Sequence, residues 1–439
     1  MGKLDVVTSR ALARPAEQVD EAGMRVHRAI FSDPELFELE MKHIFEGTWL
    51  YLAHETQIPK RNDFFTTVMG RQPVVVLRNK KGEINVLVNA CSHRGNKICN
   101  TVYGNKSALT CSFHGWTYNT DGELLGMPKE EGAGDPECFD KRQLNLKRAP
   151  RVGIYRGFIF ASLNPDAPAL EDHLGGTKTI IDLMMDQSPT GWEVIKGYST
   201  YTYDGNWKLQ AENGVDGYHV QTTHANYVLT QMNRIKTNNP TRTMEAGKLG
   251  TLEAGFFAFD RGHTLLWSDW TNPQDRPNYK FYEIYKEKFG EVHAQWMVAR
   301  LRNLLLYPNV FLMDQMSTQI RVFRPLAVDK TEVTIYCLAP VGEDAEDRNY
   351  RLRQYEDFFN ASGMATPDDL AAFNRCQEGY NGSLAGWNDC SRGAKFLTPG
   401  SGRHARALGL DLHSCGGTLD DEGIFMAQHI EWLRLMSRT

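Results

Sequence analysis

The sequence predicts an α+β fold in which a β-rich domain is inserted into a larger domain made of an antiparallel sheet flanked by helices. Short runs of β-forming residues dominate from Trp49 to about Leu163. Helical periodicity is found on both sides of that segment, and the stretch 164–168 is typical of a linker. We therefore expect residues 47–165 to form the inserted domain, with residues 1–46 and 166–439 forming the other.

The first predicted element is a helix that begins near Asp33. Asp33 is a favourable N-cap, Pro34 fits the first helical turn, and apolar residues follow at helical spacing: Phe37, Met41, Ile44 and Phe45. Strands are then expected over residues 73–78, 84–88 and 157–163, with residues 79–82 as a turn between the first two.

The segment after the linker mixes both kinds of pattern. Strands are expected over residues 198–207, 310–325 and 331–340. Helices are expected over residues 209–227, 348–361 and 424–436, and another should open at Thr366-Pro367.

Composition excludes several classes of protein. The chain has 439 residues, 41% of them hydrophobic and 23% charged, which is typical of a globular protein. A formal charge of −5 and a pI near 6.2 argue against nucleic acid or an anionic membrane as the main partner. No apolar run approaches a membrane span, and residues 1–22 lack the apolar core of a secretory signal. With eight cysteines in so long a chain, we expect a cytoplasmic protein with reduced thiols.

Two short motifs each combine one thiol with one imidazole. Cys91-Ser92-His93 and Cys111-Ser112-Phe113-His114 are separated by seventeen residues and follow or join predicted strands. A tetrahedral zinc site uses the same residue types, but zinc fingers pair Cys with Cys and His with His. A Rieske [2Fe–2S] centre places two thiolates on one iron and two imidazoles on the other, which matches the mixed pairs. Zinc remains the alternative.

A second candidate metal site lies in the segment around His219 and His224. Residues five apart are about 140° out of phase on a regular helix, so both imidazoles face one ion only if the helix is broken there. Asp216 precedes His219 by one helical turn. One further carboxylate would complete the facial triad of mononuclear non-haem Fe(II), and Asp369 is the candidate. The alternative for Asp369 is a capping box with Thr366, which periodicity alone favours.

These motifs resemble the large (α) subunit of Rieske non-haem iron ring-hydroxylating dioxygenases, and most closely the benzoate, toluate and anthranilate group. The resemblance extends over nearly the whole chain, and the cluster motifs and Asp216-Gly217-Tyr218-His219 are its most specific parts. It implies that Cys91, His93, Cys111 and His114 hold the cluster and that His219, His224 and Asp369 hold the iron. It also implies that Asp216 links the cluster of one subunit to the iron of its neighbour, and that Asn213 lies close to the iron.

The same resemblance implies the reaction and the partners. NADH electrons would arrive through a separate flavin and iron–sulfur reductase, because the chain has no dinucleotide-binding glycine fingerprint. O2 and an aromatic ring would react at the iron to give a cis-diol, and a small β subunit would complete an α3β3 hexamer. The expected substrate is a benzoate-type acid. The alternatives are a non-acidic ring such as an arylamine, a Rieske electron carrier without oxygenase activity, and a zinc-stabilised interaction protein.

The sequence also offers candidate residues for a substrate pocket. Relatives of the benzoate type often carry a bulky residue where this chain has Ala225, so a larger pocket and a compensated packing change are both open. Arg234, Lys236 and Arg302 are candidates to bind a substrate carboxylate. The expected pocket residues are Val220, Ala225, Met316, Phe359 and Phe373.

Overall fold

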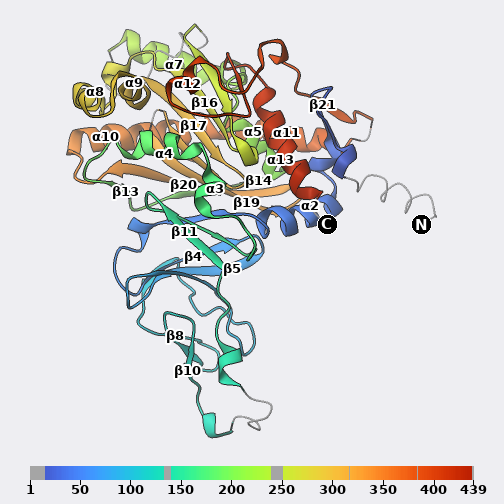
Figure 1. The fold of residues 1–439 in the computed structure, drawn as a ribbon, viewed down its shortest axis with the longest axis vertical. Coiled ribbons are helices and arrows are strands. Elements are labelled where there is room, and N and C mark those ends of the chain that lie inside the picture. Colours follow the sequence, from blue (N-terminus) through green and yellow to red (C-terminus); the bar gives the residue numbers. More distant parts are fainter. Residues whose placement is uncertain (1–14, 133–139, 239–250, 316, 383, 438–439) are drawn as a thin grey trace. The chain divides into compact units, whose positions relative to one another are not determined.

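A computed structural model describes residues 15–132, 140–238, 251–315, 317–382 and 384–437 (Figure 1). The chain divides into two compact units: Met41–His173, and Met1–Glu40 together with Leu174–Thr439. One unit is thus inserted into the other, as the predicted α+β fold requires. The predicted limits 47–165 fall inside the smaller unit and, as the limits of an independently folding domain, stay a prediction.

The smaller unit is built from short antiparallel strands. In the described residues, four of them form a sheet in the order β6-β5-β4-β7: β4 Asp63–Met69, β5 Gln72–Arg78, β6 Ile84–Val88 and β7 Tyr103–Asn105. A second sheet joins β11 Arg151–Tyr155, β12 Phe158–Ser162 and β3 Leu50–His54, and a third joins β10 Leu124–Gly126, β9 Thr117–Tyr118 and β8 Leu109–Thr110. The predicted strands 73–78, 84–88 and 157–163 are confirmed.

The larger unit is organised around one antiparallel sheet, which has ten strands among the described residues. Its order is β13-β20-β19-β18-β17-β16-β15-β23-β22, with β14 also paired to β20 (Figure 1). The strands are β13 Trp192–Val194, β14 Ser199–Tyr203, β15 Ala254–Ala258, β16 Thr264–Asp269, β17 Arg300–Leu306, β18 Val310–Asp314, β19 Thr318–Ala327, β20 Lys330–Pro340, β22 Thr398–Pro399 and β23 Ser414–Gly416. The predicted strand 310–325 is therefore two strands, β18 and β19.

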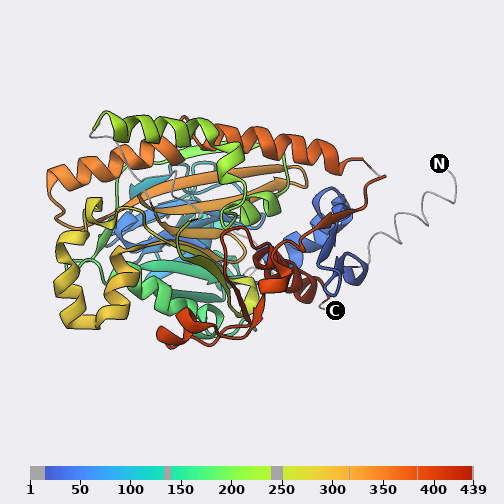
Figure 2. The same ribbon diagram turned by 90° about the horizontal axis from the view of Figure 1, so that it is seen from above.

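Helices pack on both faces of this sheet. Their bounds are α4 Thr177–Met185, α5 Trp207–Asn213, α6 Val220–Thr223, α7 Ala225–Lys236, α8 Tyr282–Phe289, α9 Glu291–Val298, α10 Ala345–Gln354, α11 Thr366–Tyr380, α12 Arg403–Ala407 and α13 Gly423–Met436. α4 and α9 contact β17, α5 contacts β19, α10 contacts β20, and α13 contacts β15 and β16. α8 and α9 lie side by side (Figure 2). None of the helices in the described ranges is long and apolar enough to cross a membrane.

Two adjacent residues of β17 show which helices cover each face of the sheet, because successive side chains of a strand point to opposite faces. Arg302 donates to the carbonyl oxygen of Met297 at 3.1 Å, so its face is the one covered by α9. Its neighbour Asn303 donates to the carbonyl oxygen of Gly214 at 2.9 Å, directly after α5. The second face is the one that carries the candidate metal site.

The N-terminal helix joins the larger unit through a buried carboxylate. Helix α2, Pro34–Glu40, begins where predicted, with Asp33 Oδ1 accepting from the backbone N–H of Glu35 at 2.7 Å. Glu40 at its end is fully buried and accepts from Lys208 Nζ at 2.5 Å and from the indole N–H of Trp432 at 2.6 Å. A buried charge must be paired and hydrogen-bonded, and this arrangement satisfies Glu40 with groups from distant helices.

Candidate functional site: two metal centres and a cavity

The two Cys/His motifs form loops of the same design. In the first loop, the N–H of Gly95 donates to the carbonyl oxygen of Cys91 at 2.8 Å; in the second, the N–H of Gly115 donates to that of Cys111 at 3.0 Å. Both glycines have φ 73°, a left-handed conformation that a side chain would strain. Glycine at these positions therefore lets two tight turns present one cysteine each.

The loops bury the thiols and leave the imidazoles near the surface. Cys91 and Cys111 are 3% and 2% exposed and belong to the core of the smaller unit, whereas His93 is exposed and His114 half-buried. The two imidazole rings lie 4.6 Å apart between centroids, and the indole of Trp116 stacks on His93 at 4.8 Å. Thiols on the inside and imidazoles on the outside form the ligand set that a dinuclear Rieske cluster needs.

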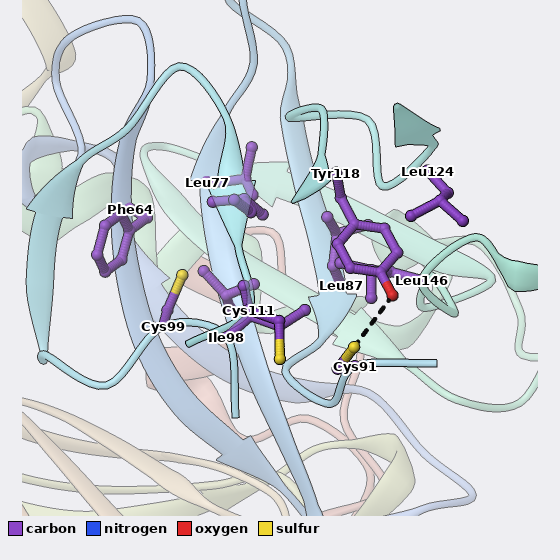
Figure 3. Packing of buried hydrophobic residues seen from close by; sticks show 12 residues of the cluster. Phe64, Leu77, Leu87, Cys91, Ile98, Cys99, Cys111, Tyr118, Leu124 and Leu146 are labelled. Carbon is purple, nitrogen blue, oxygen red and sulfur yellow. Dashed lines mark hydrogen bonds between the residues drawn. The ribbon is translucent and has the colours of Figure 1, made fainter. Parts of the chain in front are cut away.

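Hydrogen bonds prepare the sulfur atoms to be thiolates. The Tyr118 hydroxyl lies 3.3 Å from Cys91 Sγ, and Asn96 Nδ2 donates to Cys111 Sγ at 3.5 Å. Burial raises the pKa of Cys111, but N–H groups of the following backbone and the Asn96 amide outweigh it and hold that pKa below its usual value. Figure 3 shows both sulfur atoms at one end of the core, with the Tyr118 hydroxyl beside Cys91.

The mixed pairing of one cysteine and one histidine on each loop favours a dinuclear cluster over zinc. All ligands of a tetrahedral zinc ion contact one centre at 2.0–2.3 Å, so their donor atoms must gather tightly. In the described part of the chain, the group of three or more His, Cys, Asp or Glu that reaches single-ion spacing is His219, His224 and Asp369. Cys91, His93, Cys111 and His114 are divided between two loops, with the thiols buried and the imidazoles nearer the surface, which fits two thiolates on one iron and two imidazoles on the other.

The second site forms where the helical segment breaks twice. The predicted helix 209–227 is three helices, α5, α6 and α7, because His219 is the N-cap of α6 and His224 is its C-cap with φ −103° and ψ 28°. This kink turns both imidazoles the same way, and their Nε2 atoms lie 3.2 Å apart. The predicted departure from a regular helix is confirmed, with breaks at His219 and at His224, on either side of the single turn α6.

Asp369 completes the group from a helix remote in sequence. Its Oδ1 lies 3.2 Å from His224 Nε2 and 3.5 Å from His219 Nε2, and the three donor atoms lie within 4.8 Å of one another. The alternative capping box is wrong: Ala365 is the N-cap of α11 without a side-chain cap, and the Thr366 hydroxyl donates to Phe359. Two imidazoles and one carboxylate at this spacing fit a non-haem iron ion with open positions.

Two polar side chains hold this triad from outside. Asn213 Nδ2 donates to Asp369 Oδ1 at 3.2 Å and lies 3.4 Å from His219 Nε2. Asp216 Oδ2 lies 3.2 Å from His219 Nδ1. A carboxylate on Nδ1 keeps the proton there and leaves the Nε2 lone pair for a metal, which is how second-shell carboxylates orient histidine ligands.

A cavity of about 430 Å³ lies next to the triad. Its wall includes Tyr218 and Val220, on either side of His219, and Phe358, whose ring centroid is 5.6 Å from that of His224. The remaining lining residues are Asp216, Gly217, Gln221, Thr222, Tyr227, Val228, Thr251, Leu266, Ser268, Leu301, Asn303, Gln315, Leu419 and Asp420. Its size and largely apolar wall suit a small aromatic molecule.

Of the predicted pocket residues, Val220 lines this cavity and three others do not. Ala225 is solvent-exposed at the start of α7, so its methyl group does not set the cavity's size. Phe359 is replaced by Phe358 because a π-helical turn over Tyr355–Phe359 shifts the phase of the helix. Phe373 packs on Tyr203 at 4.9 Å instead. Met316 lies outside the described residues.

The three cations expected to bind a carboxylate do not line the cavity either. Arg234 pairs with Asp357, and Arg302 pairs with Asp314 on the opposite face of the sheet. Lys236 is exposed at the end of α7. The polar lining residues Ser268, Asn303 and Gln315 were not predicted. Asn303, a buried amide in β17, was the one local signal that pointed to them.

Comparison with known proteins agrees with this geometry. Residues 48–143 match the Rieske [2Fe-2S] domain, and residues 191–402 match the ring hydroxylating alpha subunit (catalytic domain). Toluate 1,2-dioxygenase subunit alpha of Pseudomonas putida is 50% identical, covering 96% of this chain and 92% of that protein. The chain belongs to the ring-hydroxylating dioxygenase alpha subunits. It is a Rieske-type oxidoreductase with a catalytic domain that offers a His/His/Asp site for mononuclear iron.

Other members of the family differ in the ring for which they are named. The 2-halobenzoate 1,2-dioxygenase large subunit of Burkholderia cepacia is 48% identical, covering 98% of this chain and 93% of that protein. The anthranilate 1,2-dioxygenase large subunit of Acinetobacter baylyi is 47% identical, with 94% and 89% covered. Chlorobenzene dioxygenase subunit alpha of a Cupriavidus species is 43% identical, with 95% and 92% covered.

The fold of this family member is also that of a solved structure. Naphthalene 1,2-dioxygenase from a Rhodococcus species, bound to indole, superposes with a TM-score of 0.83 at 25% identity and covers 97% of this chain and 98% of that chain. The predicted organisation, a Rieske domain inserted into an α+β catalytic domain, is confirmed.

Proposed function

We propose that this chain is the large subunit of a terminal dioxygenase that adds both atoms of O2 to the ring of a benzoate-type acid and gives a cis-diol. The observation that carries the proposal is that the relatives named for toluate, 2-halobenzoate and anthranilate are 50%, 48% and 47% identical over nearly the whole chain. All three names are those of aromatic carboxylates. The electrons come from NADH through a separate reductase, as is typical of the family.

In this proposal Cys91 and Cys111 hold one iron of the cluster, and His93 and His114 hold the other. His219, His224 and Asp369 hold the mononuclear iron, and their donor atoms, which lie within 4.8 Å of one another, support that assignment. When bound, the cluster supplies one-electron transfer and the mononuclear iron supplies oxygen activation.

The chain's own residues then have three tasks. Asp216 holds the proton on His219 Nδ1 and, we propose, links the cluster of a neighbouring subunit to this histidine. Asn213 holds Asp369 Oδ1 through a 3.2 Å hydrogen bond. The apolar wall of the cavity, Val220, Leu266, Leu301 and Phe358 among it, orients the ring and excludes water.

The proposal includes partners of three kinds. Relatives described as a "subunit alpha" or a "large subunit" support a small β subunit, which we place in an α3β3 hexamer. A flavin and iron–sulfur reductase supplies electrons, since no glycine fingerprint for a dinucleotide follows a strand in this chain. We expect the assembly to act in the cytoplasm.

Two measurements test this function. We expect three irons per chain in the fully loaded protein, and oxygen uptake with a reductase and NADH that depends on a benzoate, with a cis-diol as product. Two irons per chain would indicate a Rieske electron carrier, and zinc without iron would indicate a structural zinc protein.

A neutral ring is the second candidate substrate. It is favoured by the relative named for chlorobenzene and by the absence of Lys, Arg and His from the described residues that line the cavity. Oxygen uptake with chlorobenzene or aniline, but with none of a panel of benzoates, would establish this second function and reject the first.

A further inference from the structure

The cavity beside the triad has an uneven distribution of polar groups. Its two carboxylates, Asp216 and Asp420, belong to the loops that carry Tyr218 and Leu419. Neutral donors come from both sides of the cavity: Tyr218, Gln221 and Thr222 lie in or beside α6, and Ser268, Asn303 and Gln315 come from the sheet or directly follow it. A negatively charged ligand is therefore repelled by the two carboxylates, and the sheet side of the wall offers it neutral donors with no carboxylate among the described lining residues.

The strand register gathers the three neutral side chains on one sheet face. Ser268 is paired with Leu301, and the next inward-facing pair is Leu266 with Asn303. β18 pairs Asp314 with Arg302, so Gln315, one residue further, continues the row of Leu301. The result is a floor of polar side chains separated by two leucines.

Positive charge lies behind this floor. Asp314 is buried and receives two guanidinium groups: Arg276 Nη2 lies 2.6 Å from its Oδ1, and Arg302 contacts its Oδ2. Two cations on one carboxylate leave a net charge of +1 in a region of low dielectric. Gln315 borders this network as well as the cavity, because it also lines a small pocket of about 20 Å³ beside Arg276.

Gln315 and Asn303 have N–H groups to offer. The described contact of Gln315 Nε2 is the Met313 sulfur at 4.0 Å, and a thioether is a weak acceptor. Asn303 uses one amide hydrogen on the Gly214 carbonyl oxygen and has a second. Gln315 is 9% exposed, so the bond that it forms with an anion is shielded from water.

We propose that Gln315, assisted by Asn303 and Ser268, is the residue that recognises the substrate carboxylate, with the charge of the Arg276–Arg302–Asp314 network behind it. The inference rests on the proposed function, that of an aromatic-acid dioxygenase. Recognition is by neutral donors in an electrostatically positive wall, rather than by a cation in the pocket. An ionised acceptor strengthens such hydrogen bonds about twofold relative to a neutral one, so benzoate is favoured over its neutral amide.

The test compares benzoate with benzamide, which has nearly the same shape and no charge. Binding to the holoenzyme is measured by isothermal titration calorimetry, and kcat and KM are measured with the reductase. Gln315→Glu keeps the size of the side chain and places a carboxylate against the substrate's own. Gln315→Leu removes the donor without adding charge. Asn233→Asp, on the exposed surface of α7, is the matched control for an added negative charge.

We expect Gln315→Glu to raise the Kd and KM for benzoate by about 10- to 100-fold, the size expected for losing a hydrogen bond to a charged group, while those for benzamide change by less than about threefold. Gln315→Leu should weaken benzoate binding about tenfold. In every variant, kcat at saturation should change less than KM, and Asn233→Asp should match the wild type.

Two results would overturn the assignment, and they are distinguishable from failure of the proposed function. If wild-type protein binds and oxidises benzoate, but Gln315→Glu binds it equally well, Gln315 does not recognise the carboxylate. The same holds if both ligands weaken equally. If the wild type oxidises neutral rings and no benzoate at all, the proposed function itself is rejected before any variant is compared.

Discussion

Asp216 Oδ2 lies 3.2 Å from Nδ1 of His219, while the other oxygen of the same carboxylate accepts from the backbone N–H of Tyr218 at 2.7 Å and of His219 at 3.3 Å. One side chain thus shapes the turn before α6 and sets the orientation of the ring. Burial lowers the pKa of His219, but Asp216 and Asp369 outweigh it and raise that pKa above its ordinary value. The distances fix the orientation of the ring: Nδ1 faces Asp216, so Nε2 points towards Asp369.

Replacing Asp216 should separate metal binding from turnover. We expect Asp216→Ala to retain three irons per chain and to lower turnover about 10- to 100-fold, because the carboxylate orients a ligand and is not itself one. Iron analysis and oxygen uptake measure the two effects. Asp204→Asn, an exposed carboxylate of the same unit, should behave as wild type. Unchanged turnover in Asp216→Ala, with both metals bound, would show that the proposed bridge is wrong.

The neighbouring aspartates of α11, Asp368 and Asp369, should differ in whether their replacement releases the mononuclear iron. Asp369 is 8% exposed and its Oδ1 faces both Nε2 atoms, whereas Asp368 Oδ2 lies 3.8 Å from the outer nitrogen of His224. We expect Asp369→Ala to lose the mononuclear iron and retain the two cluster irons, with no activity. Asp368→Asn should keep all three irons and lose at most about tenfold in activity. Iron loss in Asp368→Asn instead would reassign the ligand.

The hydroxyl of Tyr118 should raise the cluster's reduction potential, since a hydrogen bond to a ligand sulfur stabilises the more negative, reduced state. Tyr118→Phe removes the 3.3 Å contact with Cys91 Sγ. If that bond is worth about 1 kcal/mol, the potential should fall by about 40 mV. A redox titration followed by cluster absorbance measures the change. Tyr103→Phe, whose hydroxyl accepts from Gln57, is the control and should not shift the potential.

His54 should make the smaller unit sensitive to acid. It is 3% exposed, and burial lowers its pKa from 6.5 to about 4. Between pH 6.5 and 4, His54 takes up a proton in the unfolded chain but not in the folded chain. Protonation therefore stabilises the unfolded chain, and the free energy of unfolding falls as the pH falls through this range. Between pH 7.5 and 5 that loss should be about 2 kcal/mol.

The His54 prediction is checked by following unfolding of the smaller unit at several pH values. His54→Asn keeps a side-chain acceptor for the Thr56 N–H, which the native ring contacts at 3.4 Å. The difference in free energy of unfolding between the wild type and His54→Asn should shrink as pH falls. Any effect of pH on the metal cluster is common to both proteins and cancels in this difference. A constant difference would mean that His54 does not carry this dependence.

Local patterns predicted the elements that have a clear periodicity or clear turn and cap residues at their ends. The helix after Asp33 has one buried and one exposed side, the strands β5 and β6 are short apolar runs bounded by turn residues, and each was found within a few residues, as was the helix near the C-terminus. β16 and β17 were not predicted. β17 is buried along its whole length, so it lacks alternation, and two of its seven residues are arginines. Those charges are tolerated because Arg302 meets Asp314 from the adjacent strand.

The sequence by itself determined the family and the nature of both metal centres, because thiolate, imidazole and carboxylate ligands must occur as particular residue types at short, recognisable spacings. Only the tertiary structure decided what surrounds them. The choice of Asp369 over a capping role depends on a helix about 150 residues beyond His219, and the polar floor of Ser268, Asn303 and Gln315 depends on the register of three strands. Such contacts join segments remote in the chain, and no local pattern encodes which side chains they bring to one cavity.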